Sequence, residues 1–459
     1  MKRNATNSTE ARKCVRRSTL AERLAPRFRQ LDYEMEKRTN YYAMSPSQRG
    51  EARLERLNIA WKRALSGSEY YMKLANDNKL PSRFKSLEEF QSRVPITPKQ
   101  AVRQTPGLFK FPGRQPGKWM STSGSTGAPI QVFWGKEGHL ECMRDLYWAR
   151  LDWGVYPFDR QTMLWGVPIK CDRGLKAAYN KTMQKVVDRL RQRMRFSALH
   201  LNPTTLRQVY DSIIRFESRS LYAFPGAAHQ LAIANLDRPL FPDTLKAAFL
   251  SAEPVLPQHR ESIKKVFGCR AVGEYGSVEC GMLAEQRQDG TYKVCESSVI
   301  LETVDHPDGY SVLVTQLRNT AFPLFRYDIG DLTSSPLNRH KDEIESLGEI
   351  FGRSHDVVRS PNGGAYHGVL LEYIIRRVPS VLLFQVVQRE DFSIDIQLQP
   401  LPNMKITQEQ KATVRERIKD EIDFDMEIRI QIVDEIQRTP AGKHRYVTSE
   451  LEKQLGCSV

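Results

Sequence analysis

The sequence lacks the features that would assign the protein to several familiar classes. No apolar run approaches the roughly 20 residues of a membrane-spanning helix, and residues 1–10 contain no apolar core of a secretory signal. The seven cysteines are scattered and none forms a Cys-x-x-Cys pair, so neither a disulfide framework nor a zinc ribbon is expected. We therefore expect a cytoplasmic protein without a membrane partner.

The basic charge of the chain comes without a recognisable nucleic-acid motif. A net charge of +15 and a pI of about 9.4 favour anionic partners. No basic–aromatic repeat accompanies this charge, so nucleic acid is not the expected partner. Residues 170–195 carry nine Lys or Arg, and we interpret them as a solvated face of a mostly helical segment. A docking surface for an acidic co-substrate or carrier protein, or a nucleic-acid-binding surface, remains the alternative.

The length of 459 residues allows two or three domains. Short apolar segments alternate with helical patterns between about residues 160 and 280, which is typical of an α/β sandwich with ligand loops at the strand ends. The pattern changes near residue 350. We predict a basic, flexible N-terminal segment (1–40), a large α/β domain (41–350), a hinge (351–356) and a small mobile α+β lid domain (357–459).

Residues 121–129 read Ser-Thr-Ser-Gly-Ser-Thr-Gly-Ala-Pro and lie between two strand-like segments. Gly124 and Gly127 allow sharp turns and a close approach of the backbone to a ligand. The hydroxyls add donors beside free backbone N–H groups, which suits a polyphosphate. No Gly-Lys-Ser/Thr follows, so this is not a Walker A loop. A plain hairpin turn is the competing interpretation.

Five further motifs follow this loop in a fixed order. They are Ser-Ala-Glu-Pro at 251–254, Tyr-Gly-Ser-Val-Glu at 275–279, Tyr-Asp-Ile-Gly-Asp at 327–331, Gly-Arg-Ser-His-Asp at 352–356 and Pro-Ala-Gly-Lys at 440–443. Together with the loop they resemble the adenylate-forming superfamily, and most closely its branch of phenylacetate-CoA ligases, coenzyme F390 synthetases and CapK-like proteins. The resemblance covers nearly all of the chain after about residue 50.

The resemblance implies a site for ATP and Mg²⁺. It assigns a catalytic role to Lys443 and Glu279, with Glu279 also holding the metal. Tyr275 would pack on adenine, and Asp331 would bind the ribose hydroxyls. The residues implied to bind the nucleotide are Ser123, Gly124, Ser125, Thr126, Gly127, Ser251, Ala252, Glu253, Pro254, Glu274, Tyr275, Gly276, Ser277, Asp331 and Arg353.

The sequence departs from the family pattern at two positions. Val278 replaces a threonine whose hydroxyl contacts phosphate in the family, and His355 stands where the family usually has the hinge aspartate. The wall of the acyl pocket is predicted with less support from the residues, since ordinary core packing explains the same side chains equally well. The predicted wall residues are Tyr222, Phe224, Pro225, Gly226, His229 and Gly273.

The reaction implied is activation of a small carboxylic acid as an acyl adenylate with release of pyrophosphate. Acyl transfer would follow, with CoA as the expected acceptor. An enzyme that passes the acyl group to an amine or to a carrier-protein thiol in a biosynthetic pathway is the alternative. The oligomeric state stays open, with a homodimer among the candidates.

Overall fold

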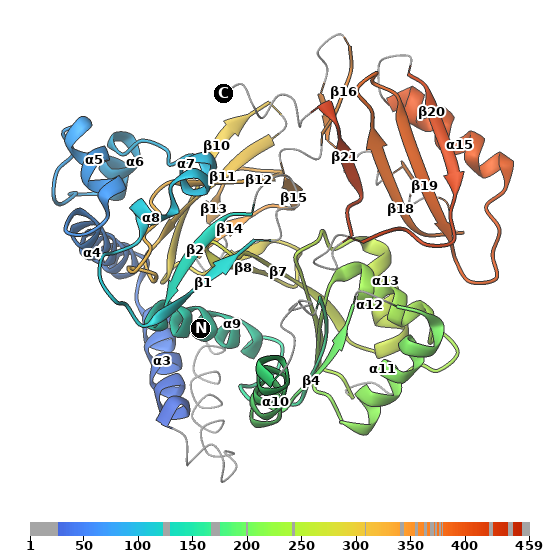
Figure 1. The fold of residues 1–459 in the computed structure, drawn as a ribbon, viewed down its shortest axis with the longest axis horizontal. Coiled ribbons are helices and arrows are strands. Elements are labelled where there is room, and N and C mark those ends of the chain that lie inside the picture. The colour runs from blue at the N-terminus through green and yellow to red at the C-terminus, as the bar shows by residue number, and fades with distance from the viewer. Residues whose placement is uncertain are drawn as a thin grey trace.

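The computed structural model describes residues 26–122, 129–166, 175–198, 201–240, 244–307, 309–339, 344–353, 357–361, 365–367, 371, 374–375, 378, 380–421, 426–438 and 444–451. It consists of a large N-terminal α/β domain and a smaller C-terminal domain, drawn orange to red in Figure 1. This confirms the predicted fold class. No helix within the described ranges is both long and apolar enough to cross a bilayer.

A group of helices opens the chain and packs on an antiparallel sheet. Trp61, Tyr71 and Phe325 meet at the centre of this core, with ring centroids 4.9–6.0 Å apart. The last part of the N-terminal segment is helical and docked, because Arg38 of α3 is buried in an ion pair with Asp145 of α9. These helices are α3 (Pro26–Ala43), α4 (Pro46–Leu65), α5 (Glu69–Asp77), α6 (Leu87–Arg93), α7 (Lys99–Gln104), α8 (Pro106–Phe109) and α9 (Lys136–Leu151).

A nine-stranded sheet with the order β13-β14-β9-β8-β7-β6-β5-β3-β4 forms the middle of the large domain. Strands β4, β3, β5, β6 and β7 are parallel, and β8 continues the sheet in the antiparallel sense. The strands are β3 (Gln161–Trp165), β4 (Arg193–Ser197), β5 (Ser220–Ala223), β6 (Ala247–Ser251), β7 (Arg270–Ser277), β8 (Gly281–Gln286), β9 (Tyr292–Val294), β13 (Asn338–Arg339) and β14 (Glu345–Leu347).

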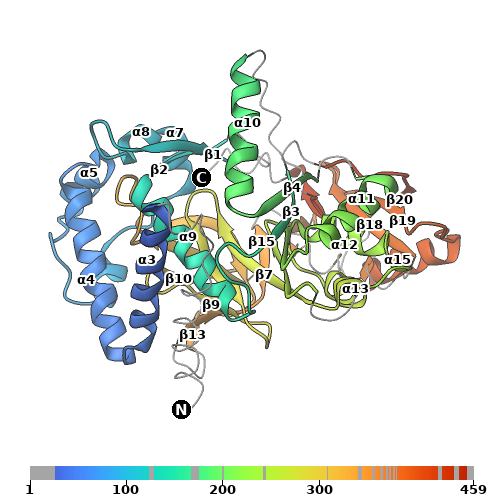
Figure 2. The same ribbon diagram turned by 90° about the horizontal axis from the view of Figure 1, so that it is seen from below.

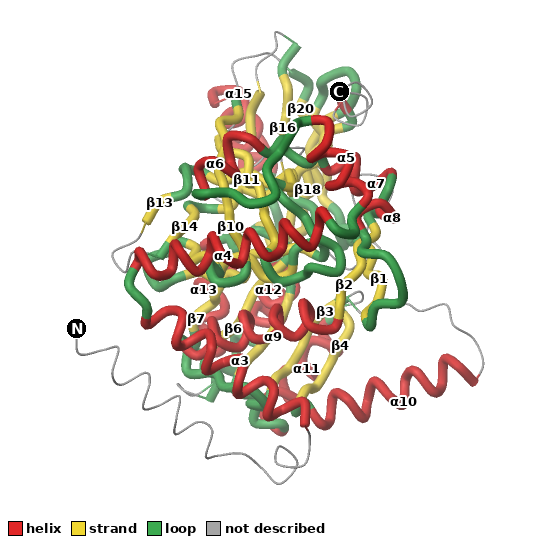
Figure 3. Tube along the Cα trace, turned by 90° about the vertical axis from the view of Figure 1, so that its left-hand side faces the viewer, coloured by secondary structure: helices red, strands yellow, loops and turns green. Residues whose placement is uncertain are grey.

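Helices cover both faces of the parallel strands. On one face α11 (Pro203–Arg215), α12 (Pro225–Ile233) and α13 (Pro257–Phe267) enclose an apolar core. On the other face lies α9, whose Arg150 contacts the ring of Phe249. Helix α10 (Leu175–Leu190) extends away from the body of the domain (Figures 2 and 3). This arrangement leaves the carboxyl ends of β5, β6 and β7 to carry the predicted ligand loops.

Two smaller sheets complete the large domain. The antiparallel sheet has the order β10-β11-β12-β15, and β1 pairs with β2 on either side of the predicted phosphate loop. Strands β10 and β11 pair in the antiparallel sense from Val299 and Gln316 to His306 and Gly309. The bounds are β1 (Gly117–Ser121), β2 (Gln131–Gly135), β10 (Val299–His306), β11 (Gly309–Gln316), β12 (Tyr327–Thr333) and β15 (Ile350–Arg353).

The C-terminal domain has a four-stranded sheet with the order β20-β19-β18-β21. Its central strands alternate buried and exposed residues, so one face packs on α15 with Val414 and Ile418 in the core. The bounds are β16 (Val357–Arg359), β17 (Ala365–His367), β18 (Val381–Gln388), β19 (Ile394–Pro400), α15 (Gln408–Glu421), β20 (Ile428–Ile432) and β21 (Val447–Ser449).

Candidate functional site

Tyr275 and Asp331 meet at the carboxyl end of β7. The Tyr275 hydroxyl donates to Asp331 Oδ2 at 3.0 Å, although 56 residues separate the two. Burial and the neighbouring carboxylate raise the pKa of Tyr275 well above its ordinary value, so the phenol keeps its proton and stays a donor. The structure thus brings together the residues predicted to contact adenine and ribose.

The sequence at 270–272 predicts a short strand that ends at Val272, but β7 runs on through the Tyr-Gly-Ser segment to Ser277. The antiparallel partner β8 explains this difference, because it pairs with residues 274–277. Gly276 is required here, since a Cβ atom would lie 2.4 Å from the carbonyl oxygen of Gly281. Ser277 Oγ accepts the Cys280 N–H at 3.0 Å and so closes the turn that precedes β8.

Glu279 is buried near a lysine that the sequence did not single out. Only 4% of Glu279 is exposed, and its Oε1 lies 4.0 Å from Lys99 Nζ. Lys99 also donates to the carbonyl oxygen of Ile329 at 2.5 Å, which ties α7 to β12. The two residues are distant in the sequence, so no local pattern could have paired them.

The buried hydroxyl of Tyr327 has no hydrogen-bond partner in the described part of the chain. Glu279 and Asp331 are among the charges that act on it, and burial raises the pKa of Tyr327 well above its ordinary value. An orphaned donor beside these carboxylates suits a polar ligand that carries both acceptors and a cation.

Mg²⁺ is often bound through one or two carboxylates together with substrate phosphates and water, so Glu279 fits the predicted metal. Within the described ranges no three His, Cys, Asp or Glu side chains form a cluster that could hold a metal by themselves.

The loop after β6 carries the Ser-Ala-Glu-Pro motif and joins the two domains. Ser251 Oγ donates to the carbonyl oxygen of Glu274 at 2.9 Å, and Ala252 has a φ of +73°, in the left-handed region. Glu253 accepts the Gly226 N–H at 3.1 Å and the His444 N–H at 2.6 Å. Pro254 follows in the same loop. Glu253 thus links the start of α12 to the C-terminal domain.

The chain directly after Lys443 lies against the large domain. His444 is 4% exposed, its Nε2 lies 2.8 Å from the carbonyl oxygen of Phe384, and burial lowers its pKa to about 3. Two residues later, the Tyr446 hydroxyl lies 3.2 Å from His259 Nε2 on α13. These contacts hold the segment that begins at His444 beside the loop after β6 and beside α13.

Several predicted residues cannot be placed in this way. Lys443, His355 and the loop residues 123–127 lie outside the described residues. Arg353 is in β15, where its backbone is the register partner of Asp331.

Glu274 forms an ion pair that the motifs did not indicate. Arg150 of α9 donates to both Glu274 oxygens at 2.7 and 3.1 Å, and both side chains are buried. The Arg150 guanidinium also lies over the rings of Tyr222 and Phe249, at 5.1 and 4.4 Å from their centroids. On β8, Glu285 is the register partner of Glu274, and neither of its carboxyl oxygens has a hydrogen-bond partner among the described residues.

The predicted acyl-pocket residues fall into separate environments. Tyr222 and Phe224 both stack on Trp165, with centroids 4.7 and 4.1 Å away. His229 is buried and its Nδ1 lies 2.8 Å from Ser262 Oγ on α13. The space beside Gly273 is filled by Tyr292, whose hydroxyl oxygen would lie 2.4 Å from an added Cβ.

Pro225 and Gly226 form the first turn of α12. A Cβ at Gly226 would lie 3.4 Å from Glu253 and 3.9 Å from His444 Cβ, so Gly226 faces the contact between the domains. Only Tyr222 and Phe224 therefore share a surface, and the pocket wall remains a prediction.

Comparisons of the sequence with known proteins find similarity to CapK. Residues 358–450 match the family model of the CapK C-terminal domain. Protein CapK of Staphylococcus aureus is 24% identical over 401 residues, which are 84% of this chain and 86% of that protein.

The fold is similar to that of solved ligases. A 2-hydroxyisobutyryl-CoA ligase in the postadenylation state, in complex with R3-HIB-AMP, matches with a TM-score of 0.69 and 18% identity over 90% of this chain and 94% of that chain. The anthranilate CoA ligase AuaEII, in complex with anthranoyl-AMP, matches with a TM-score of 0.50 and 16% identity over 71% and 65%. The chain thus resembles the adenylate-forming ligases in its fold and CapK in its C-terminal domain, which agrees with the resemblance inferred from the sequence motifs.

Proposed function

We propose that this chain, which has the adenylate-forming fold and a CapK-type C-terminal domain, activates a carboxylic acid with ATP. The products of the first step are an acyl adenylate and pyrophosphate, and the acyl group then passes to an acceptor, for which we propose CoA. The observation that carries the proposal is the meeting of Tyr275 with Asp331 at 3.0 Å near buried Glu279. The attachment of His444 to Glu253 supports it, because it places the chain next to Lys443 beside the same strand ends.

In the proposed reaction, a carboxylate oxygen of the acid forms a bond to the α-phosphorus of ATP. The bond from that phosphorus to the pyrophosphate oxygen breaks, and pyrophosphate leaves. Both reactants are anions, so catalysis consists mainly of positioning and of stabilising the charge on the phosphate oxygens. Mg²⁺, when bound, would neutralise part of the phosphate charge.

Each residue has a defined task in this proposal. Asp331 would orient the ribose, and the Tyr275 hydroxyl fixes the Asp331 carboxylate by donating to it. Glu279 would hold the metal, and Lys99 would limit the local excess of negative charge. Lys443 would supply a positive charge between the attacking carboxylate and the α-phosphate.

The direct test is acid-dependent exchange of labelled pyrophosphate into ATP, screened over aryl, fatty and amino acids. Loss of the Lys443 charge should cost about 3 kcal/mol of transition-state stabilisation, which lowers the exchange rate of Lys443→Ala about a hundredfold. Lys405→Ala is the matched control, because Lys405 is an exposed lysine of the same domain. Unchanged exchange in Lys443→Ala, or no exchange with any acid, would refute the proposal.

The acceptor needs a separate measurement, because pyrophosphate exchange reports only the first step of the proposed reaction. The acid identified by exchange is incubated with ATP and with CoA, an amine or a carrier protein. Thioester formation that depends on CoA supports the proposed acceptor. Product formed only with the amine or the carrier thiol would replace CoA by that acceptor while leaving the first step intact.

A further inference from the structure

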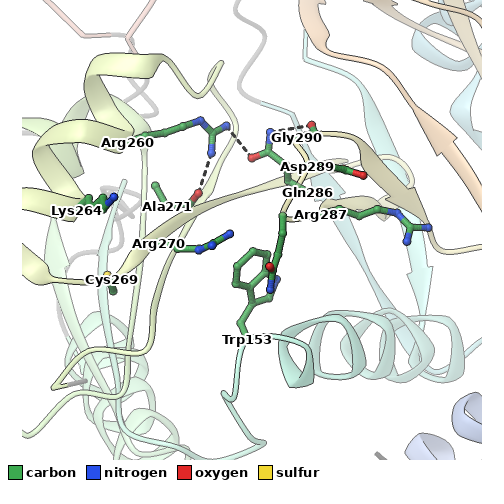
Figure 4. A pocket seen from close by; sticks show the side chains of 11 residues that line it. Trp153, Arg260, Lys264, Cys269, Arg270, Ala271, Gln286, Arg287, Asp289 and Gly290 are labelled. Atoms are coloured by element: carbon green, nitrogen blue, oxygen red, sulfur yellow. Dashed lines mark hydrogen bonds between the residues drawn. The ribbon is translucent and has the colours of Figure 1, made fainter. Parts of the chain in front are cut away.

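A pocket of about 310 Å³ opens at the amino end of β7, a central strand of the nine-stranded sheet. Its wall comes from the end of α13, the start of β7 and the turn between β8 and β9, with Trp153 at its base (Figure 4). Tyr275 lies five residues along β7 from Arg270, about 16 Å at the usual rise of a strand. The pocket is therefore distinct from the proposed nucleotide site.

The lining of the pocket is strongly cationic. Four basic side chains belong to it, and they are Arg260, Lys264, Arg270 and Arg287. The only acid in the lining is Asp289, whose Oδ1 accepts the N–H and the hydroxyl of Thr291 at 3.0 and 2.7 Å. Within the described ranges, Arg260, Lys264 and Arg270 form no ion pair with a carboxylate. The lining thus carries an excess of positive charge.

Arg260 is held in place by neutral groups. Its guanidinium donates to the carbonyl oxygen of Ala271 at 2.8 Å and to Gln286 Oε1 at 2.7 Å (Figure 4). Gln286 is itself fixed, since it donates to the carbonyl oxygen of Gly290 at 3.0 Å and accepts the Gly273 N–H at 3.2 Å. These contacts orient the guanidinium without neutralising it, which leaves a preorganised cation for an anionic ligand.

We propose that this pocket is a second anion site, which binds a small molecule that carries phosphate. Phosphate matches the fixed donors of Arg260 and the point charge of Lys264. The half-buried indole of Trp153 offers a flat surface beside the charges, which suits a ligand with a planar ring attached to its phosphate. A volume of about 310 Å³ lies at the lower end of the range for small-molecule sites.

The test uses ¹⁹F NMR of the full chain labelled with 5-fluorotryptophan, in which the Trp153 signal is assigned with Trp153→Phe. Inorganic pyrophosphate and AMP are the probes, titrated separately. We expect a saturable shift of the Trp153 signal that weakens at high salt, because the contacts are charged. Tighter binding of AMP than of pyrophosphate identifies a nucleotide-like ligand. Tighter binding of pyrophosphate than of AMP identifies an inorganic phosphate anion as the ligand.

The main variant is Lys264→Gln/Arg270→Gln, since both side chains are exposed, whereas Arg260 also holds Gln286. It should bind each probe at least about tenfold more weakly. Lys265→Gln is the matched control, because Lys265 is exposed on the same helix but does not line the pocket. No shift of the Trp153 signal with either probe, or equal affinity in the main variant and the control, would overturn the proposal.

Discussion

The two ends of strand β7 differ in charge and in the way that charge is compensated. At its start, Arg270, Lys264 and Arg260 lie around an open pocket, and the Arg260 guanidinium donates to the neutral groups of Ala271 and Gln286. At its other end, Glu274 is buried and paired, and Tyr275 donates to Asp331. Lys264 and Arg270 are exposed and keep their hydration, so they need no partner, whereas an ionised carboxylate that is buried, such as Glu274, does.

The carboxyl end of β7, where Glu274 is buried, depends on residues from distant parts of the chain. Arg150 comes from α9 and Lys99 from α7, and each approaches a carboxylate near the end of β7. His444 comes from the C-terminal domain, and its backbone N–H donates to the Glu253 carboxylate. A site built from such contacts forms only when the whole domain is folded, so its loss should be measurable as lost stability.

Of the stability changes that test this difference between the two ends of β7, the largest is expected from Arg150→Met. The change leaves Glu274 buried without its cation, next to Glu285, which already lacks hydrogen-bond partners in the described structure. Removing one partner of a buried ion pair typically costs about 3–5 kcal/mol of the free energy of unfolding. Urea unfolding followed by circular dichroism measures the loss.

The double variant Arg150→Met/Glu274→Met is the control for this prediction. With both charges gone and similar volumes retained, most of the lost stability should return. A double variant as unstable as Arg150→Met would mean that Arg150 contributes through its packing on Tyr222 and Phe249, and not through its charge.

Local sequence signals predicted the elements around the site well. The glycine at position 268 predicts the end of a helix, and it ends α13 with a φ of +64°. Thr407 and Gln410 have the spacing of a capping box, and they form its reciprocal hydrogen bonds before α15. Such signals depend on neighbours within four residues, so they can be read from the chain itself. Thr97 precedes Pro98, and this sequence predicts a helix cap, but the Thr97 hydroxyl instead donates to the distant Phe325 carbonyl oxygen.

The site itself was predictable only in part. Motif order identified Tyr275, Glu279 and Asp331, and the structure brings the first and the last of these into contact. The partners Lys99, Arg150 and His444 carry no motif, and their contacts span more than a hundred residues. Pairings of that kind follow from the three-dimensional fold, and a single sequence contains no pattern that specifies them.

A smaller effect is expected on the pH dependence of the free energy of unfolding, through the buried side chain of His444. Burial lowers the pKa of His444 to about 3, whereas a histidine in the unfolded chain titrates near pH 6.5. Below pH 6.5 the unfolded chain therefore binds a proton that the folded protein does not. Stability falls with falling pH, by about 2 kcal/mol between pH 7 and pH 5.

The variant His444→Gln isolates this contribution, because its amide can still donate to the Phe384 carbonyl oxygen but does not titrate. Its urea midpoint should fall less between pH 7 and pH 5 than that of the unmodified protein, by the equivalent of about 2 kcal/mol. Buried His229, whose pKa is lowered to about 4, is present in both proteins and cancels in the difference. Equal falls in both would place the titrating group elsewhere.

The smallest predicted effect is a gain in stability from Glu285→Met at the buried end. Burial and the neighbouring Glu274 raise the pKa of Glu285 well above its ordinary value, so the folded protein holds a proton that the unfolded chain releases above about pH 4.3. Stability is therefore lost as pH rises, and a methionine of similar size should restore about 1 kcal/mol at pH 7. Glu261→Met, at an exposed position on α13, should leave the urea midpoint unchanged. A loss of stability in Glu285→Met would mean that its carboxyl group makes a favourable contact at the end of β7, and that both buried glutamates there are compensated.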